Sequence, residues 1–106
     1  MKEGVKNDIG KLRYDLLPVR AVREVVRVFT FGAKKYEDRN WEKGVKFGKY
    51  YAALQRHLSA WWDREENDSE SGLSHLAHAC CCILFLLHYS LFSKYRRFDD
   101  RPKEGE

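Results

Sequence analysis

Two histidines three residues apart are the first feature of this chain that could do chemistry. His75 and His78 fall on one face of a helix, where two imidazoles can share a metal ion or a phosphate. Asp68 and Glu70 come just before them, and carboxylate oxygens are the ligands that Mg²⁺ takes in proteins. The alternatives are that the acidic residues cap the helix and that the histidines are core or interface side chains. The segment therefore predicts either a metal site or the start of a packed helix.

Two further ionisable groups could join this chemistry. Glu24 lies among three arginines, Arg20, Arg23 and Arg27, so one interpretation is that it belongs to an exposed ion-paired face. The alternative is that Glu24 is an inward carboxylate that binds metal or activates water. His57 shares a helical spacing with apolar residues on the same face (Tyr50, Leu54 and Trp61), so it points inward. A core histidine is the simpler interpretation of His57, and a functional group is the other.

Basic and aromatic residues cluster between the first two predicted helices. The cluster comprises Lys34, Lys35, Tyr36, Arg39, Asn40 and Trp41. Lys and Arg suit a triphosphate, and Trp or Tyr suits stacking on a base. A generic basic surface, with Trp41 as a small anchor onto the core, explains the same residues.

Three consecutive cysteines exclude a disulfide framework. Cys80, Cys81 and Cys82 point in different directions on a helix and are expected to pack as small hydrophobes. Their free thiols favour an intracellular, reducing compartment, and we expect a cytoplasmic protein. A zinc-stabilised module on His75, His78 and Cys82 is an alternative, although the usual two-cysteine spacing is absent.

Composition places the chain among small globular domains. Its 106 residues suffice for one domain, and 43% apolar with 14% aromatic residues argue against disorder. The net charge of +4 allows an anionic partner but does not by itself indicate nucleic acid. The first 16 residues are polar and charged, unlike a signal peptide. A small basic nucleic-acid-binding or regulatory protein remains the alternative class, which salt-dependent DNA binding without turnover would favour.

The elements that must position these residues are three helices. The first begins near Pro18 and ends at Gly32 or Tyr36, although its valines also suit a strand. The second runs from about Tyr50 to Glu66, and the third covers Leu73 to Phe92. We expect an N-terminal arm (1–16), an all-α domain (17–93) and a charged, frayed tail (94–106).

The third helix decides how the bundle is completed. Residues 73–92 carry no formal charge, but their apolar centre (79–87) is too short to span a membrane. A helix apolar all round is a central or interface helix. We therefore expect a bundle whose core is completed by a homo-oligomer, a dimer or a tetramer.

The order of these segments resembles a known family. The matching stretches are residues 11–18 (KLRYDLLP), 31–36 (FGAKKY), 40–44 (NWEKG), 53–58 (ALQRHL) and 68–79 (DSESGLSHLAHA). Together they are similar to the phage dATP/dGTP diphosphohydrolases, which are related to the all-α MazG-like pyrophosphohydrolases. The resemblance implies cleavage of a deoxynucleoside triphosphate to the monophosphate and pyrophosphate with Mg²⁺ or Mn²⁺, which adjusts the nucleotide pool in the host cytoplasm.

On that resemblance we assign expected roles to the candidate residues. Metal and proton-transfer chemistry is expected from Glu70, His75 and His78, with Glu24 and Asp68 as further metal ligands. Substrate contacts are expected from Arg13, Lys34, Lys35, Tyr36, Asn40, Trp41, Arg56 and His57. MazG-like enzymes usually hold Mg²⁺ with Glu-x-x-Glu and Glu-x-x-Asp motifs, which this chain lacks. Either the site is rebuilt from the residues above, or its metal chemistry is altered or lost.

Overall fold

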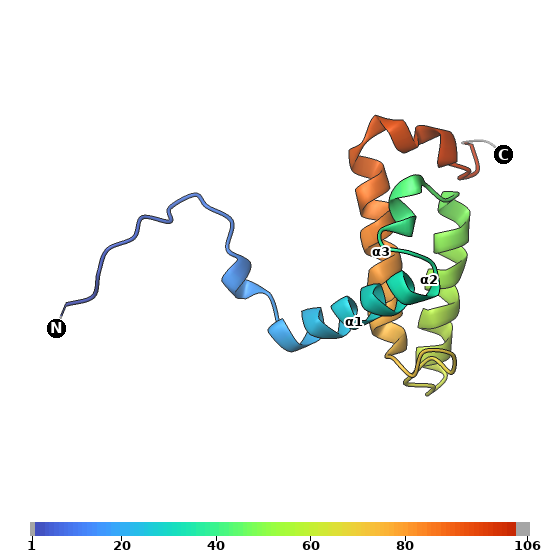
Figure 1. Cartoon of the computed structure of the whole chain (residues 1–106), viewed down its shortest axis with the longest axis horizontal. Coiled ribbons are helices and arrows are strands. Elements are labelled where there is room, and N and C mark those ends of the chain that lie inside the picture. Colours follow the sequence, from blue (N-terminus) through green and yellow to red (C-terminus); the bar gives the residue numbers. More distant parts are fainter. Residues whose placement is uncertain (1, 104–106) are drawn as a thin grey trace.

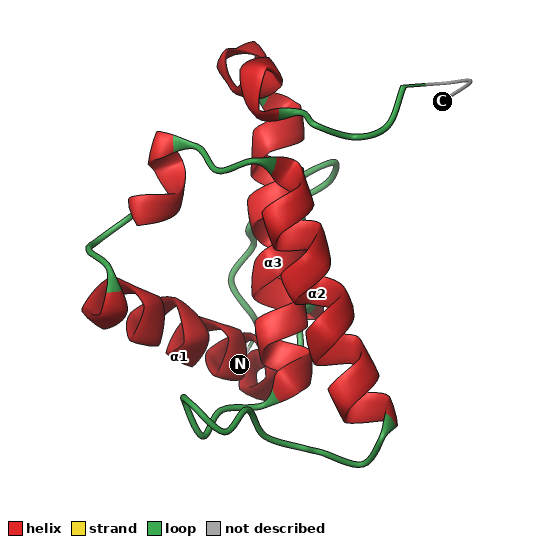
Figure 2. Cartoon of the chain, turned by 90° about the vertical axis from the view of Figure 1, so that its right-hand side faces the viewer, coloured by secondary structure: helices red, strands yellow, loops and turns green. Residues whose placement is uncertain are grey.

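The structure, a computed structural model, describes residues 2–103 and is all-α over that range, as expected (Figure 1, Figure 2). Its helices are α1 (Val19–Lys35), α2 (Phe47–Trp62) and α3 (His75–Leu91). Short 3₁₀ turns lie at Tyr14–Leu16, Asn40–Lys43 and Ser93–Phe98. The only β-type pairing among the described residues is an isolated bridge between Asn67 and Ser74.

The closest packing is between α2 and α3, which run side by side, while α1 crosses α3 (Figure 1, Figure 2). The buried residues of α3 include the small side chains Ala77, Ala79, Cys81 and Cys82, which let a neighbouring helix approach closely. Val28 of α1 packs into this layer against Ala77 and Cys81. The expectation that these cysteines pack as core hydrophobes is confirmed for Cys81 and Cys82, whereas Cys80 is exposed.

The first helix forms despite its valines. Val25, Val28 and Phe29 recur at helical spacing and meet the same core, so burial of one face outweighs the weak helix propensity of valine. Lys34 and Lys35 in the last turn interact favourably with the helix dipole. The second helix ends at Trp62 rather than near Glu66, because Arg64 turns the chain with a φ of 73°.

The segment that follows α3 differs from the expectation drawn from the sequence. The sequence predicted a frayed tail over residues 94–106, but the part from 94 to 100 packs on the helices. Tyr95 is 2% exposed, and its hydroxyl donates a hydrogen bond of 2.8 Å to the Glu42 carbonyl. Asp100 accepts a hydrogen bond of 2.8 Å from the backbone of Gly48. Tyr95 and Phe98 dock this segment, although the charged residues around them suggested a solvated tail. Residues 104–106 of the predicted tail lie outside the described part of the chain.

The arm expected at the N-terminus extends away from the three helices (Figure 1). Its residues from 2 to 18 are exposed, including Val5, Ile9 and Leu12 at 80–99%. None of the helices in residues 2–103 combines the length and the hydropathy that a membrane crossing needs.

Among the described glycines, Gly44 is the one that lies against the ring of Phe98 in the docked segment 93–98. Its φ is +98°, and a Cβ at this position would overlap the ring of Phe98. We expect Gly44→Ala to lower the free energy of unfolding by about 3 kcal/mol, as backbone strain and overpacking add. Gly72→Ala is the control, because its φ is +73° with open space around it, and should cost only about 1 kcal/mol. Equal losses in urea unfolding would show that Phe98 does not pack there.

The accessible surface of the chain exceeds that of a compact monomer because the arm (residues 2–18) extends away from the three helices. It measures 9176 Å², whereas a compact monomer of this size exposes about 6,200 Å². The radius of gyration of 17.6 Å likewise exceeds the value of about 13 Å for a compact chain. Apolar side chains at helical spacing are exposed on α3 (Ile83, Leu87 and Leu91) and on α1 (Val19, Val22 and Val26).

We propose that a second copy of the chain covers these exposed apolar side chains of α1 and α3. They recur at helical spacing on each helix, and burying them against a partner removes apolar surface from water. Leu87→Glu should therefore shift the protein towards the monomer in sedimentation equilibrium. Tyr51→Glu, which places the same charge at an exposed aromatic residue of α2, should leave the mass unchanged. A wild-type protein that is monomeric at all concentrations would contradict the proposal.

Candidate functional site

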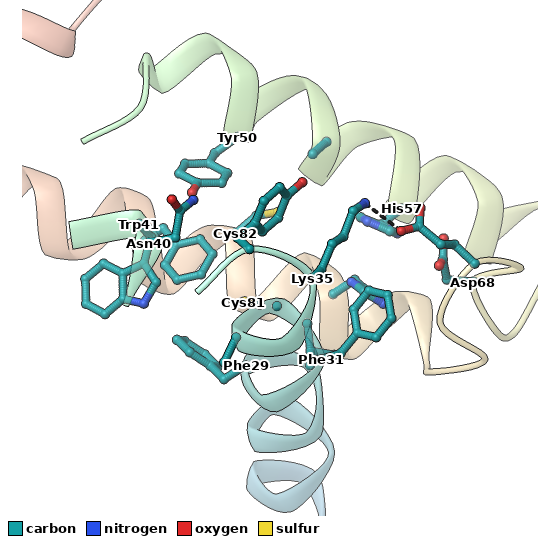
Figure 3. A pocket seen from close by; sticks show the side chains of 18 of the residues that line it. Phe29, Phe31, Lys35, Asn40, Trp41, Tyr50, His57, Asp68, Cys81 and Cys82 are labelled. Atoms are coloured by element: carbon teal, nitrogen blue, oxygen red, sulfur yellow. Dashed lines mark ion pairs between the residues drawn. The ribbon is translucent and has the colours of Figure 1, made fainter. Parts of the chain in front are cut away.

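A cleft of about 1060 Å³ lies where α1 approaches the α2–α3 pair (Figure 3). Its walls are the C-terminal half of α1 with the following loop, the inner face of α2, the connector between α2 and α3, and the first half of α3. Figure 3 shows Asn40 and Trp41 at one end of the cleft and His57 and Asp68 at the other. The two ends differ in chemistry.

The first end is aromatic. Trp41 stacks on Phe85 with ring centres 5.2 Å apart, and its ring meets the edge of Phe29 at 6.5 Å. The Tyr50 ring centre lies 4.8 Å from that of Phe85. The carbonyl of Trp41 accepts a hydrogen bond of 2.6 Å from the Tyr89 hydroxyl, which fixes the turn that carries it. Trp41 is thus anchored to the core, as the simpler interpretation predicted, and also lines the cleft.

The second end is built by the connector between α2 and α3, which folds back on itself. The backbone N–H of Asp68 donates to the Leu73 carbonyl over 2.8 Å, and that of His75 donates to the Glu66 carbonyl over 3.0 Å. Gly72 permits the turn with its φ of +73°. The fold of this loop turns Asp68 and Glu65 back against the first turn of α3.

Three histidines meet at this end. The Nδ1 atoms of His57 and His75 lie 2.8 Å apart, and the ring of His57 stacks on His78 at 4.5 Å. Nε2 of His75 lies 2.9 Å from a carboxylate oxygen of Glu65, and Nε2 of His78 lies 2.7 Å from the Ser71 hydroxyl. His75 is buried at 4% exposure, whereas His57 and His78 are half-buried.

The surroundings set the charge of these groups. Burial lowers the pKa of His57, and the neighbouring His78 and His75 lower it further. Burial also lowers the pKa of His78, against the opposing effect of Asp68. Burial raises the pKa of Asp68, but the hydrogen bonds from Ser71 outweigh this effect and hold the pKa below its usual value. At neutral pH the cleft therefore presents neutral imidazoles beside an ionised carboxylate.

An ion pair lies on the wall between the two ends. Lys35 Nζ and a carboxylate oxygen of Glu70 are 2.5 Å apart, and both side chains are largely exposed (Figure 3). The hydrogen bond that Lys35 donates to Glu70 raises the pKa of Lys35, so the lysine is a cation throughout the physiological range. Arg56 and Arg39 also line the cleft.

Most of the residues predicted from the sequence line this one cleft. They are Lys35, Tyr36, Asn40, Trp41, Arg56, His57, Asp68, Glu70, His75 and His78. His57 was expected among the substrate contacts, but it faces His75 and Asp68 in the polar cluster. Glu70 was expected with the metal ligands, but it pairs with Lys35.

Three predicted residues lie elsewhere. Glu24 is exposed on α1 and accepts a hydrogen bond from Arg27, which is the ion-paired alternative. Arg13 is exposed in the arm, where it pairs with Asp15. Lys34 is exposed next to Lys35 but does not line the cleft, because neighbouring residues of a helix point about 100° apart.

Two residues of this end were not predicted from the sequence. They are Glu65, the partner of His75, and Ser71, the partner of His78. Glu65 belongs to the connector, so helical spacing cannot relate it to α3. Asn67, Asp68 and Gly72 are residue types that favour turns, so they could have indicated a connector that folds back on itself. Its closure places residues 65 and 75 opposite each other.

The zinc site considered on His75, His78 and Cys82 is not the group that the structure brings together. Among the described residues, the three that could hold one ion are His57, Asp68 and His75, whose ligand atoms all lie within 4.8 Å of one another. Ser74, rather than a residue of the 67–70 turn, caps α3 by accepting a hydrogen bond from the Ala77 N–H. Asp68 is therefore free of the capping role and instead accepts from Ser71.

Comparison with known proteins gives two matches. The family profile described as "dATP/dGTP diphosphohydrolase, N-terminal" matches residues 1–101. A curated relative from Salmonella phage PMBT28, named dATP/dGTP diphosphohydrolase, is 35% identical over 98 residues, which are 92% of this chain. The chain spans 33% of the length of that relative. No solved structure matches.

The three cysteines provide a test of the cleft wall. Burial raises the pKa of Cys81 to about 12 and that of Cys82 to about 11, whereas Cys80 is exposed. Because the thiolate is the reactive form, we expect Ellman's reagent at pH 7.5 to titrate one thiol rapidly and the other two only on unfolding. Cys80→Ser should remove the rapid phase. Two or three rapid thiols in the folded protein would contradict the packing of α3.

Proposed function

Because the chain belongs to the dATP/dGTP diphosphohydrolase family, we propose that it hydrolyses a deoxynucleoside triphosphate of the dATP/dGTP type to the monophosphate and pyrophosphate. The relative from the Salmonella phage carries this activity in its name and is about three times as long. The reaction lowers the concentration of the substrate nucleotide, so its role would be to adjust the nucleotide pool in the cytoplasm of the cell where the protein is made.

The observation that supports this function is the division of the cleft into an aromatic end and an ionisable end. A nucleotide has the same division, because its base is a flat aromatic group and its triphosphate is an anion. Trp41 lies at the aromatic end, and Asn40 beside it offers an amide for hydrogen bonds to a base edge. Tyr36 also lines the cleft, next to Lys35. A base bound at the aromatic end directs the phosphates towards His57 and Asp68 (Figure 3).

The triphosphate requires cations along its path. Lys35 lies on the wall between the two ends, and its partner Glu70 is exposed enough to be displaced from it. Arg56 on α2 and Arg39 in the loop after α1 add guanidinium groups, which bind phosphate oxygens with two parallel hydrogen bonds. These residues would bind the β and γ phosphates and hold the α-phosphorus near the histidines.

Hydrolysis also requires a group that accepts a proton from the attacking water. The lowered pKa of His78 keeps its imidazole neutral at pH 7, so it can act as a base. Ser71 orients the ring through its contact with Nε2, and the stacked ring of His57 fixes its plane. The proton passes from water to His78 as the bond to the α-phosphorus forms, and pyrophosphate leaves.

A divalent ion would neutralise charge that develops on the phosphates. Mg²⁺ binds one or two carboxylates together with substrate phosphates and water. Glu70 lines the cleft beside Lys35 and is the carboxylate that would hold such a Mg²⁺ or Mn²⁺ ion together with the substrate phosphates.

The direct test is to incubate the protein with each deoxynucleoside triphosphate and Mg²⁺ or Mn²⁺ and to separate the products. We expect monophosphate and pyrophosphate from dATP or dGTP. His78→Gln should lower kcat by about 10²-fold or more, because it removes the proton acceptor. Glu70→Gln should abolish turnover while the fold stays intact. Glu66→Gln, an exposed carboxylate outside the cleft, is the matched control.

Two results would contradict the proposal. Turnover of no nucleotide with any divalent ion, by folded protein, would exclude hydrolysis by this chain. Full activity in both His78→Gln and Glu70→Gln would place the reaction outside the cleft.

A further inference from the structure

Three potential metal ligands converge at the polar end of the cleft from three separate elements. His57 comes from α2, Asp68 from the connector and His75 from the first turn of α3. Their ligand atoms lie within 4.8 Å of one another. Two ligands on one ion are at most about 4 Å apart, roughly twice a metal–nitrogen bond, so side-chain movements of less than about 1 Å complete the site.

The contact between His75 and Glu65 determines which nitrogen of His75 faces the site. An ionised carboxylate only accepts hydrogen bonds, so the proton of a neutral His75 is on Nε2, where Glu65 lies at 2.9 Å. Nδ1 then carries a lone pair. A metal-bound histidine commonly donates its other N–H to a carboxylate in this way, which fixes the ring and makes the ligand more basic.

The lone pair on His75 Nδ1 points at His57. The two Nδ1 atoms are 2.8 Å apart, so without an ion the His57 ring must donate its Nδ1 proton to His75. With the proton of His57 on Nε2 instead, both Nδ1 lone pairs face the same small space. Asp68 is held beside them because one of its oxygens accepts from the Ser71 N–H at 2.9 Å.

We infer that His57, Asp68 and His75 bind one divalent transition-metal ion of the Mn²⁺, Fe²⁺, Co²⁺ or Zn²⁺ class, with Glu65 as the positioning residue. Two imidazole nitrogens and one carboxylate suit these ions. They do not suit Mg²⁺, which prefers an all-oxygen octahedral shell. This donor set therefore does not fit the magnesium that the family resemblance implies as the resident ion of the histidine cluster.

The three ligands leave coordination positions open towards the cleft, since all three residues line it. His78 is not among them, because its Nε2 contacts Ser71 and its ring stacks on His57. A phosphate oxygen or a water can occupy an open position. That role in hydrolysis rests on the proposed function, whereas the binding of the ion rests on the three ligands alone.

The test uses Co²⁺, whose visible absorption reports nitrogen and oxygen ligands in a site of low coordination number. Metal-free protein is titrated with Co²⁺, and we expect one ion per chain. Zn²⁺ should displace it at comparable concentration, in keeping with the order of metal affinities. A hundredfold excess of Mg²⁺ should leave the spectrum unchanged. The readout needs no nucleotide and no turnover.

Four variants assign the ligands. Asp68→Asn and His57→Gln should each weaken Co²⁺ binding at least 100-fold, and Glu65→Gln, which changes only the partner of His75, should weaken it 10- to 100-fold. His78→Gln should bind Co²⁺ within threefold of the wild type although it loses turnover. Circular dichroism confirms that each variant is folded, and Glu66→Gln is the control for Glu65→Gln.

The outcomes separate this inference from the proposed function. Co²⁺ binding that depends on residues 57, 65 and 68, with no nucleotide turnover, supports the site and rejects the enzyme. Turnover with Mg²⁺ in a protein that binds no Co²⁺ rejects the site and keeps the enzyme. Unchanged Co²⁺ affinity in folded Asp68→Asn and His57→Gln, or displacement by Mg²⁺ as readily as by Zn²⁺, also overturns the inference.

Discussion

The contact between Glu65 and the buried His75 is the constraint on which the rest of the site depends. A histidine at 4% exposure needs a partner for each ring nitrogen, because an unpaired buried polar atom costs about 1–3 kcal/mol. Glu65 supplies one partner and His57 the other. To reach His75, Glu65 must be carried back by the folded connector, and the same fold delivers Asp68. One buried side chain thus links α2, the connector and α3 into a single polar cluster.

The remainder of the fold holds this cluster at one end of an open cleft. Small residues on α3 let α1 approach closely, and the last turn of α1 then delivers Lys35 to the wall. Tyr95 and the residues after it close the opposite end of the α2–α3 pair and steady the turn that carries Trp41. The aromatic and ionisable ends are therefore separated by the packing of the helices themselves.

Much of this was predictable from spacing, and the exceptions share a physical cause. The three helices, the inward position of His57 and the placing of His75 and His78 on one face follow from the helical period, which relates residues within one helix. The role of Glu65 and the docking of Tyr95 depend on loops that bring distant segments together, and no local period encodes them. Glu24 was predicted as a metal ligand because its spacing is compatible with either face of α1. The structure places it on the exposed face, where Arg27 donates a hydrogen bond to it. The absence of the expected carboxylate motifs is explained if imidazoles replace carboxylates as ligands.

The proposed function and the proposed ion together require one cleft to hold a transition-metal ion at its histidine end and a nucleotide along its length. Anomalous diffraction from crystals grown with Co²⁺ and a non-hydrolysable dATP or dGTP analogue tests this requirement most directly. We expect one anomalous peak within bonding distance of His57, Asp68 and His75, with the base against Trp41 and the phosphates beside Lys35. A cobalt ion bound only by carboxylates such as Glu70, or a nucleotide bound outside the cleft, would contradict it.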